Sequence, residues 1–370
     1  MKMYPCLFTI IKCFAVGLLL NGCTTLATDS QVPADELSQK EEVMLGDAVM
    51  PRMLQMLGGR YHDEVIQRAV QRIGVVLGGR GPRPSLSYHF VVADRSEAAL
   101  FTLPGGNIIL TRGLLWRLDD ELALSSILDE AVRRCSARPF GGKASRKMLN
   151  VSAEILAVRP EKTLVRPDSP EIRLAKLILE RDRKRPAADF REPVSGANEI
   201  LFSGEERAAF EQIKQLEAAY LLLDKARALE ADGQTKSALS AYFEAATAAP
   251  EEPQILAALG TAYLRNGELT SAMIHLRKAE SLQKDNYRIL MGLGYGALLR
   301  NDLKSADSYL RQSVSLLPEQ ENVYLIAEVL LKQGFVEQSL KNYLLVVEAD
   351  PDSKMGRAAK SRIAALENNR

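Results

Sequence analysis

Three residues of one predicted helix have the spacing of a metal site. In the segment ILDEAVRRC, Asp129 and Arg133 are four residues apart, which places them on one helical face, and Glu130 follows the first of them. Two neutral imidazoles at such positions bind zinc, and a glutamate beside the first activates the metal-bound water. Arginine is cationic at any relevant pH and cannot bind a metal ion. The segment therefore predicts a helix with the shape of a zinc site but without its chemistry.

The charged groups of this helix can pair with one another instead. Asp129 with Arg133, and Glu130 with Arg134, are acid–base pairs four residues apart, each worth about 0.3–0.5 kcal/mol if exposed. We predict that Glu130 is half of a structural ion pair. An alternative stays open, in which the chain is an active enzyme with ligands elsewhere. Its three histidines do not have metal-ligand spacing: they are His62, His89 and His275.

The elements that must position this helix are short. Apolar periodicity predicts helices over 41–56 and 63–77, the second ended by Gly78-Gly79. The segment LSYHFVVAD predicts a strand, and ALFTLPGGNIILTRGLL predicts two short strands joined at residues 104–107. A helix then runs from Glu121 to about Arg138. Residues 139–200 form a weakly patterned linker, in which only PEIRLAKLILERDRKR predicts a helix.

The segment SEAALFTLPGGNIILTRGLLWRLDDELALSSILDEAVRR resembles a known family, the HExxH zinc metallopeptidases of the HtpX, BepA and CAAX prenyl protease type. The residues that keep the family's frame are Phe101, Leu103 to Gly106, Thr111, Gly113 to Leu115 and Glu121 to Ala123. The resemblance implies a small α+β metallopeptidase-like (gluzincin) domain over residues 37–210. It also implies a third ligand downstream, in FSGEERAAFEQI, where Arg207 takes that position. The metal site is thus degenerate at Asp129, Arg133 and Arg207, Glu130 is a vestige of the catalytic glutamate, and no cofactor is expected; zinc is expected only if the enzyme is active.

The last third of the chain repeats itself. Gly233, Gly267, Asn301 and Gly334 are separated by 34, 34 and 33 residues, and a small residue follows five positions after each. The repeat resembles the tetratricopeptide repeat, a helical hairpin in which small residues let two helices cross closely. Four units are expected at 219–252, 253–286, 287–319 and 320–353, with a capping helix at 354–370. The fold class is therefore mostly α: a small α+β domain followed by an α-solenoid.

First helices of successive tetratricopeptide repeats line a concave groove. The resemblance places on that groove a set of cations and tyrosines that suit an acidic or extended peptide: Arg227, Arg265, Tyr295, Tyr324 and Lys332. The alternative is that these side chains are merely exposed to solvent.

The N-terminus, MKMYPCLFTIIKCFAVGLLLNGC, has a short positive region and an apolar run that is too short to span a bilayer. Its end resembles the bacterial lipobox, which implies a signal peptide at 1–22, lipid on Cys23 and a tether over 23–36. Thr24 after the cysteine favours the outer membrane. The alternatives are an ordinary secreted protein and an uncleaved anchor.

The charge of the chain is nearly balanced, with 48 Lys and Arg against 47 Asp and Glu, so nucleic acid is not an expected partner. The combined features predict a lipid-anchored envelope protein on the periplasmic face of the outer membrane. The resemblance to the metallopeptidase family implies that it acts as a non-catalytic scaffold or adaptor, which binds envelope proteins or peptides during outer-membrane protein assembly or quality control. Two alternatives remain: an active periplasmic metalloendopeptidase, and a plain repeat scaffold that the front domain only stabilises.

Overall fold

The computed structural model describes residues 37–137, 146–157, 166–183 and 201–368, and most of these residues are helical. The predicted signal peptide, Cys23 and the tether lie outside the described residues. Among the residues that are described, no helix is long and apolar enough to cross a membrane. The elements of the N-terminal part are α1 (Gln39–Met56), α2 (Glu64–Arg80), β1 (His89–Ala93), β2 (Leu100–Thr102), the short 3-10 helix η1 (Pro104–Gly106), β3 (Asn107–Thr111), α3 (Arg112–Leu115), α4 (Glu121–Ser136), α5 (Arg146–Ala157), α6 (Pro170–Arg183) and α7 (Gly204–Gln215).

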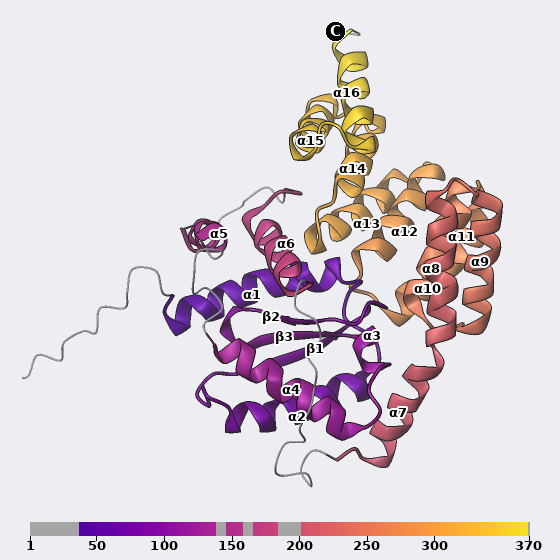
Figure 1. Cartoon of the computed structure of the whole chain (residues 1–370). Coiled ribbons are helices and arrows are strands. Elements are labelled where there is room, and N and C mark those ends of the chain that lie inside the picture. The colour runs from indigo at the N-terminus through magenta and orange to yellow at the C-terminus, as the bar shows by residue number, and fades with distance from the viewer. Residues whose placement is uncertain (1–36, 138–145, 158–165, 184–200, 369–370) are drawn as a thin grey trace, which may run out of the picture.

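A small mixed sheet forms the centre of the N-terminal domain. Its strand order is β1-β3-β2, with β3 parallel to β1 and antiparallel to β2. Ile108 and Leu110 of β3 pack with α2 and α4, whereas Ile109 packs with α1 and α6. Figure 1 shows α1 on one side of the sheet and α2 and α4 on the other. Because helices cover both faces, every residue of β3 is buried.

Local signals place the first two helices, with small shifts from the predicted bounds. Ser38 and Glu41 form a capping box that starts α1 at Gln39. Asp63 accepts hydrogen bonds from two backbone amides at the start of α2. The prediction that Gly78-Gly79 ends α2 is wrong, since the helix continues to Arg80. Gly78 instead gives room for the Tyr88 ring, which a Cβ at this position would contact closely.

The linker also contains more structure than its sequence pattern indicates. Within 139–200, α5 forms in addition to the predicted helix α6. Met148 and Val151 of α5 pack into the apolar cluster that α1 and α6 form on the sheet. A tertiary contact, rather than a strong local pattern, therefore stabilises this helix.

The C-terminal part is a stack of helical hairpins. Each predicted unit contains one hairpin, and one more helix follows: the elements are α8 (Glu217–Ala231), α9 (Thr235–Ala248), α10 (Pro253–Arg265), α11 (Leu269–Leu282), α12 (Tyr287–Leu299), α13 (Leu303–Leu316), α14 (Gln320–Lys332), α15 (Val336–Ala349) and α16 (Lys354–Glu367). The solenoid is the expected architecture. A gluzincin fold for the front domain stays a hypothesis.

The repeat turns have the predicted backbone conformation. Gly233, Gly267 and Gly334 have φ of 76°, 81° and 86°, and Asn301 in the equivalent turn has φ of 61°. Asparagine tolerates this left-handed region better than most residues. At the helix crossing of the second unit, a Cβ on Gly260 would lie 2.7 Å from Leu276 Cγ, so the crossing requires a glycine.

The two domains lie against each other. In Figure 1, the end of α1 and the tip of the sheet point toward α10 and α12, while α14 to α16 extend away from the sheet. Helix α7 packs on α2 and α3 and leads into α8. The inner side of the solenoid therefore faces one end of the sheet, where the loops after α1 and β1 lie.

Candidate functional site

Helix α4 carries Asp129, Glu130 and Arg133, the three residues with the sequence spacing of a zinc site. Arg133 forms an ion pair with Asp129 and lies 3.3 Å from Glu130, whose other carboxylate oxygen is 2.7 Å from Arg134 Nε. Both predicted acid–base pairs are therefore present. Partial burial acts to raise the pKa of Glu130, but hydrogen bonds from Arg134 and Arg133 outweigh it, and the pKa lies below its ordinary value. Glu130 is thus an ionised partner of two arginines.

The position predicted for Arg207 is wrong. Its guanidinium lies 2.8 Å from Glu121, at the first residue of α4, eight positions before Asp129. Eight residues of helix correspond to about 12 Å along the axis, so Arg207 cannot complete a site with Asp129 and Arg133. The reason is that α7 crosses near the start of α4. Among the residues that the structure describes, no three histidine, cysteine or acidic side chains are arranged to hold a metal ion.

We expect the purified protein to contain no stoichiometric zinc, because Arg133 repels a cation and no metal site forms around Asp129 among the described residues. Replacing Glu130 by glutamine should lower the free energy of unfolding by about 1 kcal/mol, the upper end for surface ion pairs, because Glu130 and Arg134 are partly buried. Metal analysis of the protein and urea denaturation of the variant measure the two quantities. One equivalent of bound zinc, with a peptidase activity that Glu130→Gln abolishes, would instead show an active enzyme.

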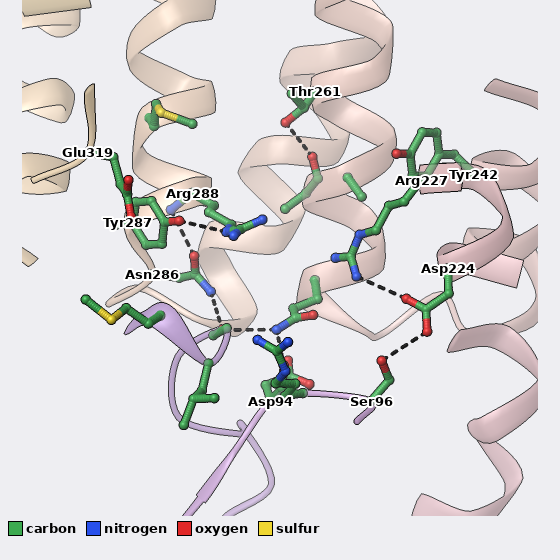
Figure 2. Close-up of a pocket in the computed structure, with 18 of the residues that line it drawn as sticks. Asp94, Ser96, Asp224, Arg227, Tyr242, Thr261, Asn286, Tyr287, Arg288 and Glu319 are labelled. Atoms are coloured by element: carbon green, nitrogen blue, oxygen red, sulfur yellow. Dashed lines mark hydrogen bonds and ion pairs between the residues drawn. The ribbon is translucent and has the colours of Figure 1, made fainter. Parts of the chain in front are cut away.

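A cavity of about 760 Å³ lies between the repeats and the N-terminal domain. Its repeat side comes from the inner helices α8, α10 and α12, from Tyr242 of α9 and from the start of α14. Its other side comes from Met56–Gly58 and Asp94–Glu97. Ala258 and Thr261 on α10 are small and leave the hollow open. Figure 2 shows side chains of both domains around this space. Asp129, Glu130 and Arg133 do not line it.

Side-chain amides of the repeats donate hydrogen bonds to main-chain carbonyl oxygens of the N-terminal domain at the wall of the cavity. Asn286 donates to the Gly58 carbonyl at 2.8 Å, and Gln254 donates to it at 3.1 Å and also to the Asp94 carbonyl. In return, Gln55 of α1 accepts from the Tyr287 amide at 3.0 Å. These bonds satisfy polar groups that the contact between the domains removes from water. The surfaces of the two domains are therefore complementary in their hydrogen-bonding groups.

Most cations of the cavity are already paired with acids. Arg227 lies 3.2 Å from Asp224, which also accepts a hydrogen bond from Ser96 at 3.0 Å across the domain boundary. Arg265 is paired with Glu230. Arg288 differs: it is exposed, its Nε donates to Tyr287 Oη at 3.0 Å, and no described carboxylate lies within ion-pair distance.

The structure brings together two of the five predicted groove residues. Arg227 and Arg265 line the cavity, but Tyr295, Tyr324 and Lys332 do not. Tyr295 lies one turn beyond Met291, the last residue of α12 that lines the cavity, and it packs between repeats. Tyr324 contacts Tyr343 in the fourth hairpin. The cavity is narrower than the groove because the sheet loops reach only the first three inner helices and the start of the fourth.

A buried polar cluster lies beside the cavity and joins the two domains. Arg112 Nε lies 2.8 Å from Asp94, and both side chains are fully buried. The guanidinium carbon lies 3.2 Å from the centroid of the Tyr220 ring and 4.4 Å from that of Trp116. Tyr220 Oη lies within hydrogen-bond distance of both carboxyl groups, 2.5 Å from Glu252 and 3.3 Å from Asp94 Oδ1. Sequence reasoning missed this cluster, which no local motif indicates.

Comparison with known proteins identifies the repeats. A family model described as tetratricopeptide repeat matches residues 253–286, the second of the four predicted units. The chain therefore carries tetratricopeptide repeats, as the spacing predicts. Comparison with curated protein sequences gave no match.

Several solved structures are similar to part of the chain. MamA is 19% identical over 39% of this chain and 83% of its own, with a TM-score of 0.33. A thermophilic tetratricopeptide protein from Thermus thermophilus is 23% identical over 44% of this chain and 86% of its own, with a TM-score of 0.35. YrrB, described as having an unusual peptide-binding site, is 21% identical over 44% of this chain and 84% of its own, with a TM-score of 0.32.

Proposed function

We propose that the protein is a non-catalytic scaffold that binds an extended peptide segment of a partner protein in the cavity between its domains. The observation that carries this proposal is the cavity itself, with one wall from the repeats and one from the N-terminal domain. Its volume of about 760 Å³ is in the range of ligand sites.

The lining of the cavity suits a peptide better than a reaction. Met56, Leu57 and Met291 offer apolar contacts, and methionine adapts to varied side chains. Arg95, Arg227 and Arg265 each form an ion pair with an acid of the protein. Among the described lining residues, Arg288 is therefore the arginine without an ion pair, and it can donate hydrogen bonds to oxygens of the ligand.

The finer parts of the proposal concern the front domain and the place of action. The metallopeptidase-like frame around the ion-paired helix α4 supports a pseudo-metallopeptidase. The apolar run ending in Leu20-Asn21-Gly22-Cys23 supports a lipid anchor on Cys23 in the outer membrane. Envelope proteins in assembly or quality control are then the proposed partners.

Filling the cavity should block binding. Ala258 on α10 lines the cavity and is partly exposed, so phenylalanine there projects into the space without entering the core. We expect Ala258→Phe to weaken binding of a peptide selected from a random display library by at least about tenfold, or about 1.4 kcal/mol. Isothermal titration of the synthetic peptide against both proteins measures the change.

The matched control is Thr247→Phe, which adds a ring on α9 at an exposed position outside the cavity. It should bind the peptide as the unchanged protein does. If Ala258→Phe keeps full affinity, or if the library yields no peptide that binds, the cavity is not the peptide site.

A further inference from the structure

The buried cluster between the domains contains more carboxyl groups than its single cation can balance. Arg112 is its cation, and Asp94 is bound to it at 2.8 Å. Glu252, with a side chain only 6% exposed, has no arginine or lysine within ion-pair distance among the described residues. A buried carboxylate without a counter-charge costs several kcal/mol, so such a group takes up a proton instead.

The hydrogen bonds around Tyr220 also require a proton on Glu252. Tyr220 Oη lies between the two carboxyl groups, 2.5 Å from Glu252 and 3.3 Å from Asp94, but a phenol has one proton to donate. With Glu252 protonated, its O–H can donate to Tyr220 Oη, and the phenol proton can go to Asp94. With Glu252 ionised, one of the two contacts has no donor.

We infer that the proton on Glu252 stabilises the docking of the repeats on the N-terminal domain, and that loss of this proton weakens the docking. Glu252 stands at the start of α10, in the repeats, while Asp94 and Arg112 follow β1 and β3 of the sheet. Burial and the nearby Asp94 raise the pKa of Glu252 to about 8.

The other titratable groups around Glu252 do not replace this proton. His62, in the loop before α2, has Nε2 3.9 Å from Glu252. Burial lowers the pKa of His62, so its imidazole is neutral at neutral and alkaline pH. Asp63 in the same loop adds negative charge. Tyr61 and Tyr220 have pKa values raised by burial and stay neutral. Glu251, next to Glu252, is exposed and paired with Lys278.

The direction of the pH effect follows from linkage. A carboxyl group that holds its proton more tightly in the docked state stabilises docking at low pH, and this contribution is lost as the pH rises through about 8. The shape of the cavity depends on this docking, because Gln254 of the repeats donates a hydrogen bond to the Asp94 carbonyl in the cavity wall. We therefore expect the two domains to be docked around the cavity at neutral pH and their contact to weaken at alkaline pH.

The protein has a built-in reporter for this event. Trp116 is the only tryptophan in the sequence, and its ring lies 5.6 Å from that of Tyr220 across the domain boundary. Urea titration of the whole protein, followed by Trp116 fluorescence, measures opening of the junction. Between about pH 7 and about pH 9, the docking equilibrium should weaken about tenfold. Glu252→Gln cannot lose a proton, so its docking should not change over this interval.

The control is Glu251→Gln, which makes the same substitution one residue away, at an exposed position, and should keep the full pH dependence. Tyr220→Phe provides a second variant if Glu252→Gln does not fold, and removing the phenol should shift the pH midpoint of Trp116 exposure. The inference would be overturned if, in the protein without substitutions, the urea transition seen by Trp116 fluorescence were the same at the two pH values. A Glu252→Gln variant with the same pH dependence as the unchanged protein would overturn it as well.

Discussion

Replacing Arg112 by alanine should lower the free energy of unfolding by about 3–5 kcal/mol, the usual cost of removing one partner of a buried ion pair. Both side chains of the Arg112–Asp94 pair are fully buried. Without the guanidinium, Asp94 would remain buried beside Glu252 with no cation. The Tyr220 and Trp116 rings would also lose the group packed between them. Urea denaturation followed by circular dichroism measures the loss.

A double variant separates the lost charge balance from the lost packing. In Arg112→Met with Asp94→Asn, both charges leave and most of the volume stays, and exchanging a whole buried pair is often nearly neutral. The double variant should therefore regain at least half of the stability lost in Arg112→Ala. If it is as unstable as the alanine variant, packing and not the buried charge decides the effect.

Replacing Gly106 by alanine should cost about 3 kcal/mol, the sum of left-handed strain of about 1–2 kcal/mol and overpacking of about 1–3 kcal/mol. Gly106 has φ of 90°, and a Cβ there would overlap the carbonyl oxygen of Ser87. The residue is the last of the short 3-10 helix η1 that leads into β3. Thermal and urea unfolding of the variant measure the cost.

The comparison variant is Gly79→Ala. Gly79 is exposed near the end of α2, its φ is not positive, and no atom lies within 4 Å of an added Cβ. Alanine there should be neutral or stabilise by about 0.5–1 kcal/mol, since it restricts the unfolded chain and favours the helix. Equal effects at the two positions would contradict the packing role of Gly106.

The positions of Arg227 and Arg265 could be predicted because the resemblance to the tetratricopeptide repeat places both on first helices. Any chain of such hairpins presents its first helices on one side, so a residue's place in the unit predicts the face it occupies. The limits of the cavity did not follow from the period. They depend on where the loops after α1 and β1 meet α10 and α12, which excludes Tyr295, Tyr324 and Lys332.

The ion pairs of α4 were equally local, since residues four apart on a helix are neighbours. Arg207 was misplaced because its position came from an aligned motif and not from a contact. Only the packing of α7 near the start of α4 shows that its partner is Glu121.

The sequence by itself determined the repeats, their turns and the ion-paired helix. Each of these depends on residues within about one repeat of each other, and periodicity records such contacts directly. Tertiary structure alone decided the junction. Asp94 and Arg112 meet because β1 and β3 pair in parallel, with Ala93 opposite Thr111. Tyr220 and Glu252 reach them only because the solenoid docks on that end of the sheet. No local pattern encodes a contact between residues more than a hundred positions apart, and so the buried charges that hold the two domains together could be found only in the folded chain.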